Sequence, residues 1–270
     1  MRKILFFALA LAASALVFVA CDKKNEPTNS EEITTDVTPA MLAGTTWRVD
    51  SSYVEGKLDF MPHLIVEVLN TEKAVFNGSD TLDYRIEGDQ LSYGKNEYSN
   101  TVTIKRFNKD FAVINFKEMQ ADLYMALIPK AEGQELPKTA ENLFGTWKCQ
   151  YYDHRYSYYS EATQSFLWDG QKHSDPGVVY LTFNADGTFV ATNIVFARMD
   201  EQKEYASQTG WWAAQDGKFA SGYDEKPAEL PDYYWSDIVT LTSNAFYVGK
   251  TEESWTGTTQ MHYTYYTRVK

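Results

Sequence analysis

Cysteine and basic residues are both scarce in this sequence. Only two cysteines occur in 270 residues, so a disulfide framework cannot hold the fold together. Lys and Arg number 25 against 37 Asp and Glu, which gives a formal net charge of −12. This acidic balance makes nucleic acids and anionic lipid surfaces unfavourable partners, whereas a neutral ligand or a cation is compatible with it.

Motifs of common enzyme classes are also missing. The sequence contains no Gly-x-Ser-x-Gly nucleophile elbow, no P-loop and no dinucleotide-binding fingerprint. His154, His173, Asp153 and Asp175 lie close together in the sequence, but their spacing matches no zinc motif. Cys149 has no histidine partner nearby in the sequence, so we expect a buried, unreactive thiol. We therefore expect neither catalytic activity nor a bound metal ion or cofactor.

A long apolar run occurs at the N-terminus, where it resembles an export signal. Arg2 and Lys3 precede small and apolar residues up to Ala20, which is typical of a secretory signal peptide. Val19-Ala20-Cys21 resembles a lipobox, with Phe18 at a position where Leu is usual. The resemblance implies that residues 1–20 are removed and that Cys21 carries lipid. The alternative is ordinary cleavage before an unmodified cysteine.

The segment that follows predicts a tether. Residues 21–37 begin at the anchored cysteine and continue as a polar stretch without periodicity, which is typical of disorder. A flexible coil of this length spans roughly 20–25 Å. We therefore expect the folded part to stand away from a membrane of the cell envelope. The outer membrane is favoured over the inner one, and the face of the membrane stays open.

An internal repeat divides the remaining chain. Thr38–Gly44 and Thr139–Gly145 share Thr, Leu and Gly in register, and a tryptophan, Trp47 or Trp147, follows each. A glycine can end a short helical turn in the left-handed conformation, and the tryptophan then opens a strand. The residues to which we assign a structural role are Trp47, Trp147, Gly44 and Gly145.

Later segments of the two halves correspond as well. Tyr84–Leu91 parallels Trp212–Phe219, and Phe111-Ala-Val113 parallels Phe246-Tyr-Val248. The order of these matches predicts two domains of the same kind. We place their limits at residues 38–130 and 139–270, with a linker at 131–138.

Short strands dominate the predicted secondary structure of both halves, and long helical periodicity is absent. Many short strands with tight turns predict a sandwich or a barrel, and a meander of about eight antiparallel strands removes its edges by closing. We therefore predict an all-β protein with two consecutive up-and-down barrels. The expected strands are 46–54, 64–70, 73–77, 82–87, 90–93, 101–107, 110–117 and 122–129, then 146–152, 178–184, 187–197, 210–215, 218–221, 236–242, 245–251 and 260–269.

The barrel openings resemble the lipocalin and calycin family. Gly145-Thr146-Trp147 matches the Gly-x-Trp of the first strand, and Leu181–Phe189 looks like the second hairpin of bacterial lipocalin-like domains. Trp212 falls where that pattern has its central tryptophan, whereas Gly44-Thr-Thr-Trp47 is one residue longer than the motif. The resemblance covers about residues 40–270. It implies barrels that bind a small molecule or a partner, without catalytic residues.

Aromatic side chains concentrate in two long connections of the second half, residues 153–177 and 222–235. Connections are usually polar, so these side chains require burial or a ligand. They could pack over the barrel mouth or between the domains. Alternatively, their faces could stack on sugar rings or line an apolar pocket. The candidate ligand-binding residues are Tyr156, Tyr158, Tyr159, Trp168, Tyr223, Tyr233, Tyr234 and Trp235.

Two functions remain open at this point. The first is a lipid-anchored envelope protein that binds a small molecule or a glycan through its second domain. The second is a non-enzymatic structural or interaction subunit of an envelope complex, with filled barrels and no small ligand. A hollow interior lined by apolar side chains would favour the first, and a filled barrel with an exposed aromatic patch would favour the second.

Overall fold

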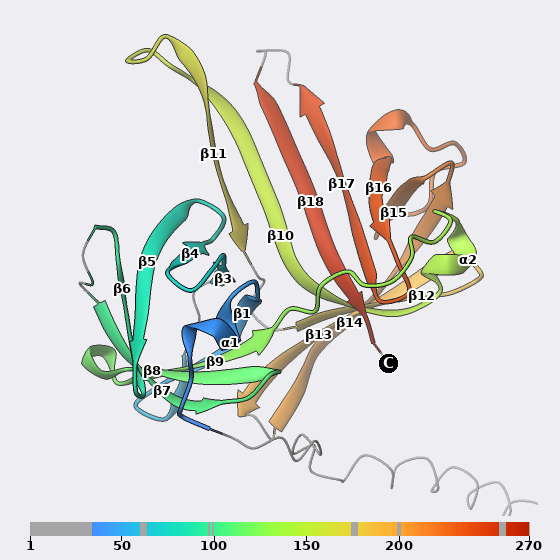
Figure 1. The fold of residues 1–270 in the computed structure, drawn as a ribbon. Helices are drawn as coiled ribbons and strands as arrows, with labels where there is room; N and C mark the ends of the chain where they lie inside the picture. The colour runs from blue at the N-terminus through green and yellow to red at the C-terminus, as the bar shows by residue number, and fades with distance from the viewer. Residues whose placement is uncertain are drawn as a thin grey trace, which may run out of the picture. The chain divides into compact units, whose positions relative to one another are not determined.

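The computed structural model describes residues 34–59, 64–96, 98, 100–173, 178–198, 201–253 and 258–269. These residues belong to one compact unit of the chain. Apart from short helical turns the structure is all-β (Figure 1). None of the helices in this part of the chain is long and apolar enough to cross a membrane. The helical turns are α1 (Pro39–Leu42), η1 (Lys117–Met119), α2 (Ala140–Leu143) and η2 (Asp232–Tyr234).

The first sheet closes into a barrel. Strand β1 pairs with β3 on one edge and with β9 on the other, so eight antiparallel strands form a ring. Strand β2 pairs with the far end of β1 and adds a hairpin to the ring. The strands are β1 (Thr46–Val54), β2 (Lys57–Asp59), β3 (Ile65–Val68), β4 (Lys73–Phe76), β5 (Asp80–Glu87), β6 (Gln90–Gly94), β7 (Asn100–Phe107), β8 (Phe111–Phe116) and β9 (Ala121–Leu127).

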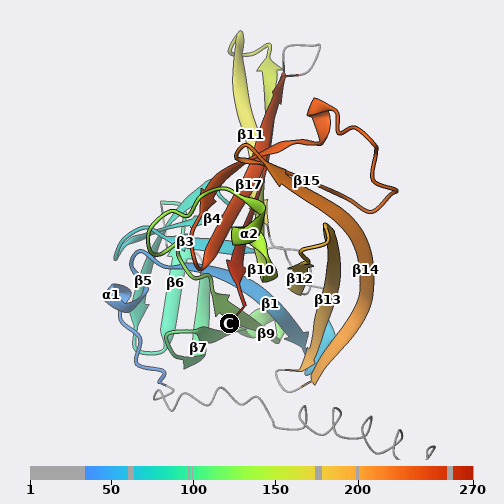
Figure 2. The same cartoon turned by 90° about the vertical axis from the view of Figure 1, so that its right-hand side faces the viewer.

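The second sheet repeats this plan with longer strands. Strand β10 pairs with β12 and β18 to close eight strands, and β11 adds the hairpin. Figure 2 shows β13 and β14 as a long curved hairpin. The strands are β10 (Gly145–Ser160), β11 (Ser165–His173), β12 (Val178–Phe183), β13 (Thr188–Arg198), β14 (Glu201–Gln215), β15 (Lys218–Gly222), β16 (Ser236–Leu241), β17 (Ala245–Glu253) and β18 (Thr259–Arg268).

The predicted fold class is confirmed, because both sheets are antiparallel meanders that close on themselves. The prediction of a long connection at 153–177 is wrong for its described part, because β10 continues to Ser160 and β11 occupies Ser165–His173. Its aromatic side chains belong to paired strands, where β-propensity rather than loop burial explains them. Strand β2 and the first half of β14 were also absent from the expected strands.

The predicted tether is too long at its C-terminal end. Thr34 forms a bridge with Phe107, and its backbone N–H donates to the Phe107 carbonyl oxygen at 3.0 Å. Val37 is buried in the first core. An apolar residue at this position gains by covering the end of the barrel, so the folded part begins by Thr34. The predicted signal peptide, Cys21 and residues 22–33 lie outside the described residues.

A β-bulge in the first strand of each barrel decides which later side chains point inward. The register against the last strand shifts between Val49 and Ser51 in β1, and between Cys149 and Tyr151 in β10. A bulge adds one residue and therefore changes the alternation beyond it. Ser52 accordingly lines the interior of the first barrel together with Trp47, although the two residues are separated by an odd number of positions.

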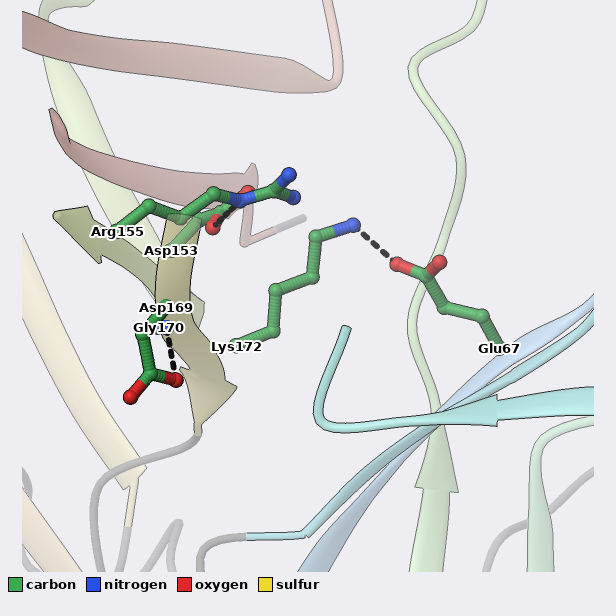
Figure 3. Close-up of polar contacts among 6 residues, drawn as sticks. All are labelled: Glu67, Asp153, Arg155, Asp169, Gly170 and Lys172. Atoms are coloured by element: carbon green, nitrogen blue, oxygen red, sulfur yellow. Dashed lines mark hydrogen bonds and ion pairs between the residues drawn. The ribbon is translucent and has the colours of Figure 1, made fainter. Parts of the chain in front are cut away.

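The barrels pack against each other through apolar and charged side chains. Ile65, Ile128, Ala245 and Tyr265 form a buried cluster, against which Tyr151 and Tyr247 pack. Burial of the two phenols from water raises the pKa of Tyr151 above its usual range and that of Tyr247 to about 12. Figure 3 shows the polar edge of this contact, where Lys172 of β11 forms an ion pair with Glu67 of β3.

Arg48 donates hydrogen bonds to backbone carbonyl oxygens of the second barrel at a gap in its strand pairing. Strand β10 pairs with β12 up to Lys148 and with β11 from Tyr152 onward. The Arg48 guanidinium, 1% exposed, donates to the carbonyl oxygens of Cys149 at 2.7 Å and Gln150 at 3.0 Å within this gap. Asp50 lies 2.8 Å from Arg48 Nε and 3.7 Å from Lys148 Nζ, so its single negative charge offsets part of the positive charge of these two side chains.

Candidate functional site

The first barrel encloses a cavity of about 450 Å³. Its wall consists of inward-facing side chains from strands around the ring, together with Val37 and Leu42 from the N-terminal side. Among the described residues that line it, none is charged, and only Ser52 and Tyr93 carry hydroxyl groups. Cavities of 300–1,000 Å³ that are mostly apolar, with a few polar groups, are typical of small-molecule sites in proteins.

Aromatic and aliphatic side chains close one end of this cavity. The rings of Trp47 and Phe107 lie 5.7 Å apart, and Val37 and Leu42 line the same region. The Trp47 indole N–H donates to Thr45 Oγ1 at 2.7 Å, so its polar atom is satisfied outside the cavity. This end is therefore a dry floor, and no polar group of the floor needs a ligand.

The mouth lies at the opposite end of the strands. Val54 ends β1, Phe116 ends β8, and Met119 follows in η1. All three line the cavity, and Met119 is also 59% exposed. A side chain that borders the cavity and remains open to solvent marks the entrance. Methionine suits an entrance because its flexible, polarisable side chain adapts to different apolar surfaces.

Tyr93 supplies a polar group on an otherwise apolar wall. Its ring stacks on Phe76 with the centroids 5.6 Å apart, which fixes the ring against the barrel wall. Burial raises the pKa of the Tyr93 hydroxyl above its ordinary value, so the phenol stays protonated at neutral pH. Together with Ser52, it can donate a hydrogen bond to one polar group of a ligand.

In the second barrel, side chains fill the end that corresponds to the floor of the first cavity. The strand registers align the barrels, because Trp47 pairs with Val66 as Trp147 pairs with Leu181, and Phe107 pairs with Ala112 as Leu241 pairs with Phe246. At four aligned inward positions the second barrel carries phenylalanine where the first carries a smaller side chain. These pairs are Val68 and Phe183, Ala74 and Phe189, Leu91 and Phe219, and Ala112 and Phe246.

These phenylalanines pack into one aromatic cluster. The ring of Phe246, which is 0% exposed, lies 5.4 Å from Phe219 and 5.7 Å from Trp147. Phe183 lies 5.0 Å from Trp212 and 5.4 Å from Phe219. Contacts of this kind add to the stabilisation from burial alone, so this half of the barrel is a packed core.

Four of the predicted ligand residues lie on the β10–β11 hairpin. Tyr156, Tyr158 and Tyr159 are exposed on β10, and the Tyr156 hydroxyl donates to Asp169 Oδ2 at 3.0 Å. Trp168 of β11 pairs with Ser157 of β10, and its side chain lies outside the described part of the structure. None of the three tyrosines is among the described residues that line the cavity of the first barrel.

The other four predicted residues lie around η2. Tyr223 and Tyr233 are exposed, whereas Tyr234 packs edge-on against Trp211 at 5.5 Å. The Trp235 indole N–H donates to the Leu230 carbonyl oxygen at 3.3 Å. The predicted connection at 222–235 agrees with the structure, because η2 is the one element between β15 and β16. Binding by these eight residues stays a prediction.

The four residues expected to be structural lie at the closed ends of the barrels. Gly44 and Gly145 have φ values of 76° and 109°, in the region where a side chain would be strained. The Trp147 indole N–H donates to the Leu143 carbonyl oxygen at 2.7 Å, and the Arg268 guanidinium lies 4.2 Å above its ring centroid. Trp47 occupies the equivalent place in the first barrel and also lines the cavity.

Candidate catalytic and metal-binding groups are sparse in the described part of the chain. No three ligating side chains there are placed closely enough to hold a metal ion together. Cys149 is a buried thiol, as its sequence context predicts. The cavity in the first barrel could not be predicted from the sequence, because it depends on side-chain size at positions that only the strand register aligns.

Comparison with known proteins identifies no family. No protein-family model matches the sequence, and no curated protein matches it. One similar solved structure is a complex of bovine odorant-binding protein with a selenium-containing odorant, with 14% identity, coverage of 52% of this chain and 78% of that chain, and a TM-score of 0.25. Another is a protein of unknown function from the DUF3598 family of Nostoc punctiforme, with 10% identity, coverage of 87% and 100%, and a TM-score of 0.24. The fold assignment therefore rests on strand order and register.

Proposed function

We propose that this protein binds a small, uncharged and mostly apolar molecule inside its first barrel. The observation that carries the proposal is the cavity of about 450 Å³ with an apolar, uncharged wall. An ion placed there would lose its hydration without gaining a counter-charge, whereas an apolar molecule gains from leaving water. The hydroxyls of Ser52 and Tyr93 favour a ligand with one hydroxyl or carbonyl group.

The proposal moves the ligand site from the second barrel to the first. The sequence analysis favoured the second half because its connections are rich in tyrosine and tryptophan. The aromatic side chains at the centre of that barrel occupy the space that is open in the first. A glycan stacked on the exposed tyrosines of the second barrel is a separate possibility, and nothing in the cavity depends on it.

A neutral fluorescent probe, N-phenyl-1-naphthylamine, tests the proposal directly. We expect saturable binding with a blue-shifted emission, because the probe leaves water for an apolar site. Leu91→Phe combined with Ala112→Phe places two phenyl rings in the cavity and should weaken binding by at least about tenfold, which corresponds to 1.4 kcal/mol. The control is Thr101→Phe, which adds the same ring at an exposed position of β7.

Competition by unlabelled molecules sharpens the result. Straight-chain alcohols should displace the probe better than carboxylates of equal length, because the lining offers no cation. Equal probe affinity in the filled double variant and the unaltered protein would contradict binding in the first barrel. Loss of binding in the Thr101→Phe control would show that the effect is not specific to the interior.

We also propose that the protein is a binding protein of the cell envelope, anchored by lipid at Cys21. The support is the sequence Val19-Ala20-Cys21 after an apolar leader. Intact-mass measurement of the membrane-extracted protein should give a chain that begins at Cys21 and carries acyl groups. A mature N-terminus elsewhere, or an unmodified Cys21, would contradict the anchor and leave the cavity proposal untouched.

A further inference from the structure

Three of the four histidines of this chain lie side by side in the second barrel. His154 on β10 is the direct cross-strand partner of His262 on β18, and their ring centroids are 4.8 Å apart. His173 on β11, on the other side of β10, lies 5.1 Å from His154. The three strands are neighbours in the sheet (Figure 1). These positions are far apart in the sequence, so only the strand register brings them together.

The histidines project from the inner side of this sheet. Beyond the bulge at Gln150, the residues of β10 alternate, and Asp153 and Ser157 are buried on the side that faces the first barrel. Tyr151 on that side packs against the interface cluster of the two barrels. His154 therefore lies on the opposite side, above the aromatic core of the second barrel, where it is exposed to solvent.

The surroundings of the cluster are polar but nearly balanced in charge. Lys250 of β17 is the cross-strand partner of His262, and it forms an ion pair with Glu252. The Lys250 ammonium also donates to the Tyr233 carbonyl oxygen at 2.9 Å. Because the carboxylate of Glu252 offsets the lysine charge, an added cation beside His262 does not face an isolated positive charge.

We propose that His154, His173 and His262 bind a divalent transition-metal ion such as Zn²⁺. Imidazole nitrogens bind Zn²⁺ at 2.0–2.1 Å, which places two rings on one tetrahedral ion with centroids about 5 Å apart. Both measured separations around His154 have this size. No carboxylate belongs to the three-histidine set, so the donors suit Zn²⁺, Ni²⁺ or Cu²⁺ rather than Ca²⁺ or Mg²⁺.

Metal binding by all three histidines requires at least one ring to move from its present position. In their present positions the described side chains include no three ligands that converge on a point, because His173 and His262 flank His154 from opposite sides. His154 and His262 form the primary pair, and His173 completes the site by turning about its side-chain torsions toward His154. Gln260 Oε1 lies 3.4 Å from His262 Nε2 and can orient that ring, as residues around metal ligands commonly do.

Calorimetric titration of the purified protein with ZnCl₂ at neutral pH tests this site. We expect one Zn²⁺ per chain and no binding of Mg²⁺. His154→Gln should weaken Zn²⁺ binding by at least about tenfold, and His262→Gln or His173→Gln should each weaken it by less or by the same factor. Acidification should weaken binding, because protons compete with the metal ion for the imidazole nitrogens.

The fourth histidine supplies a matched control. His63→Gln makes the same chemical change at the remaining histidine and should leave Zn²⁺ affinity unaltered. Co²⁺ in place of Zn²⁺ should give visible absorption bands of a four-coordinate site, and His154→Gln should remove them. Absence of Zn²⁺ binding up to about 1 mM, or equal affinity in the His154→Gln variant, would overturn the proposal. Either outcome leaves the cavity of the first barrel as it stands.

Discussion

The two barrels share one scaffold and differ in what fills it. Each begins with a short helical turn, a glycine at positive φ and a tryptophan. Each closes eight strands through its first and last strands, and each has a bulge three residues after that tryptophan, at Asp50 and Gln150. The interior then diverges, since one barrel holds a cavity and the other an aromatic core. The same backbone plan therefore supports either a binding chamber or a packed support.

Side-chain size at aligned positions accounts for this difference. Val68, Leu91 and Ala112 line the cavity, and phenylalanine stands at each aligned position of the second barrel. A phenyl ring provides many close contacts, each worth about 0.1–0.2 kcal/mol, that empty space cannot provide. The first barrel lacks this packing where its cavity lies, whereas the second barrel retains it. The two barrels contact each other through a shared buried cluster.

Phe246→Ala should have the largest effect on stability among the changes considered, because it opens the filled barrel at its centre. Phe246 contacts Trp147, Phe183 and Phe219 and is fully buried. Truncation of such a ring typically costs about 3–5 kcal/mol in the free energy of unfolding. Guanidinium unfolding monitored by fluorescence measures the loss.

Val239→Ala is the control for this truncation. Val239 lies in the same barrel, on β16, but its side chain is exposed. Its loss should change the free energy of unfolding by no more than about 0.5 kcal/mol. Similar small losses for Phe246→Ala and Val239→Ala would mean that the second barrel is not packed around Phe246, and the contrast between the barrels would fail.

The strand pattern of the fold could be predicted from sequence because inward and outward residues alternate. All eight ring strands of the first barrel fall within two residues of their expected limits at both ends. The repeat was also visible, and its match of Tyr84–Leu91 with Trp212–Phe219 agrees with the structural alignment. Turn glycines and alternating apolar residues carry this information locally.

The interior could not be predicted, because it depends on a shift of one residue. Sequence similarity aligns Phe111 with Phe246, and the structure shows that this alignment is wrong. The registers align Phe111 with Ala245 and Ala112 with Phe246. The Phe111 ring therefore points away from the first cavity, whereas the Phe246 ring points into the core of the second barrel. A shift of one residue exchanges the two faces of a strand.

The histidine cluster was missed for a related reason. His154 and His173 appeared to belong to one loop, so their spacing was compared with loop motifs for zinc. Both lie on paired strands, and the nearest partner of His154 is His262, which is more than one hundred residues away. Cross-strand neighbours are set by pairing, which local sequence does not encode. Val37 illustrates the same limit, because the residues before it in the sequence are mostly polar, whereas its own side chain is buried at the cavity floor.

A second comparison adds one phenyl ring to each barrel and should change the free energy of unfolding by a smaller amount. Ala112→Phe places in the first barrel the ring that Phe246 provides in the second, and Ala191→Phe adds a ring to the filled barrel. Ala112 borders about 450 Å³ of open space, whereas Ala191 is buried in the aromatic core. Overpacking of a filled core typically costs about 1–3 kcal/mol. Ala191→Phe should lose that amount, because its neighbours must shift to admit the ring.

Ala112→Phe should change the free energy of unfolding by less than about 1 kcal/mol, because the new ring enters space that already exists. Burial of the ring gains free energy, and the loss of side-chain freedom offsets part of that gain. Paired guanidinium unfolding curves of the two variants measure the difference without any ligand. Equal losses in both variants would mean that the walls of the first barrel cannot admit a phenyl ring, and its interior would then resemble the second barrel in packing.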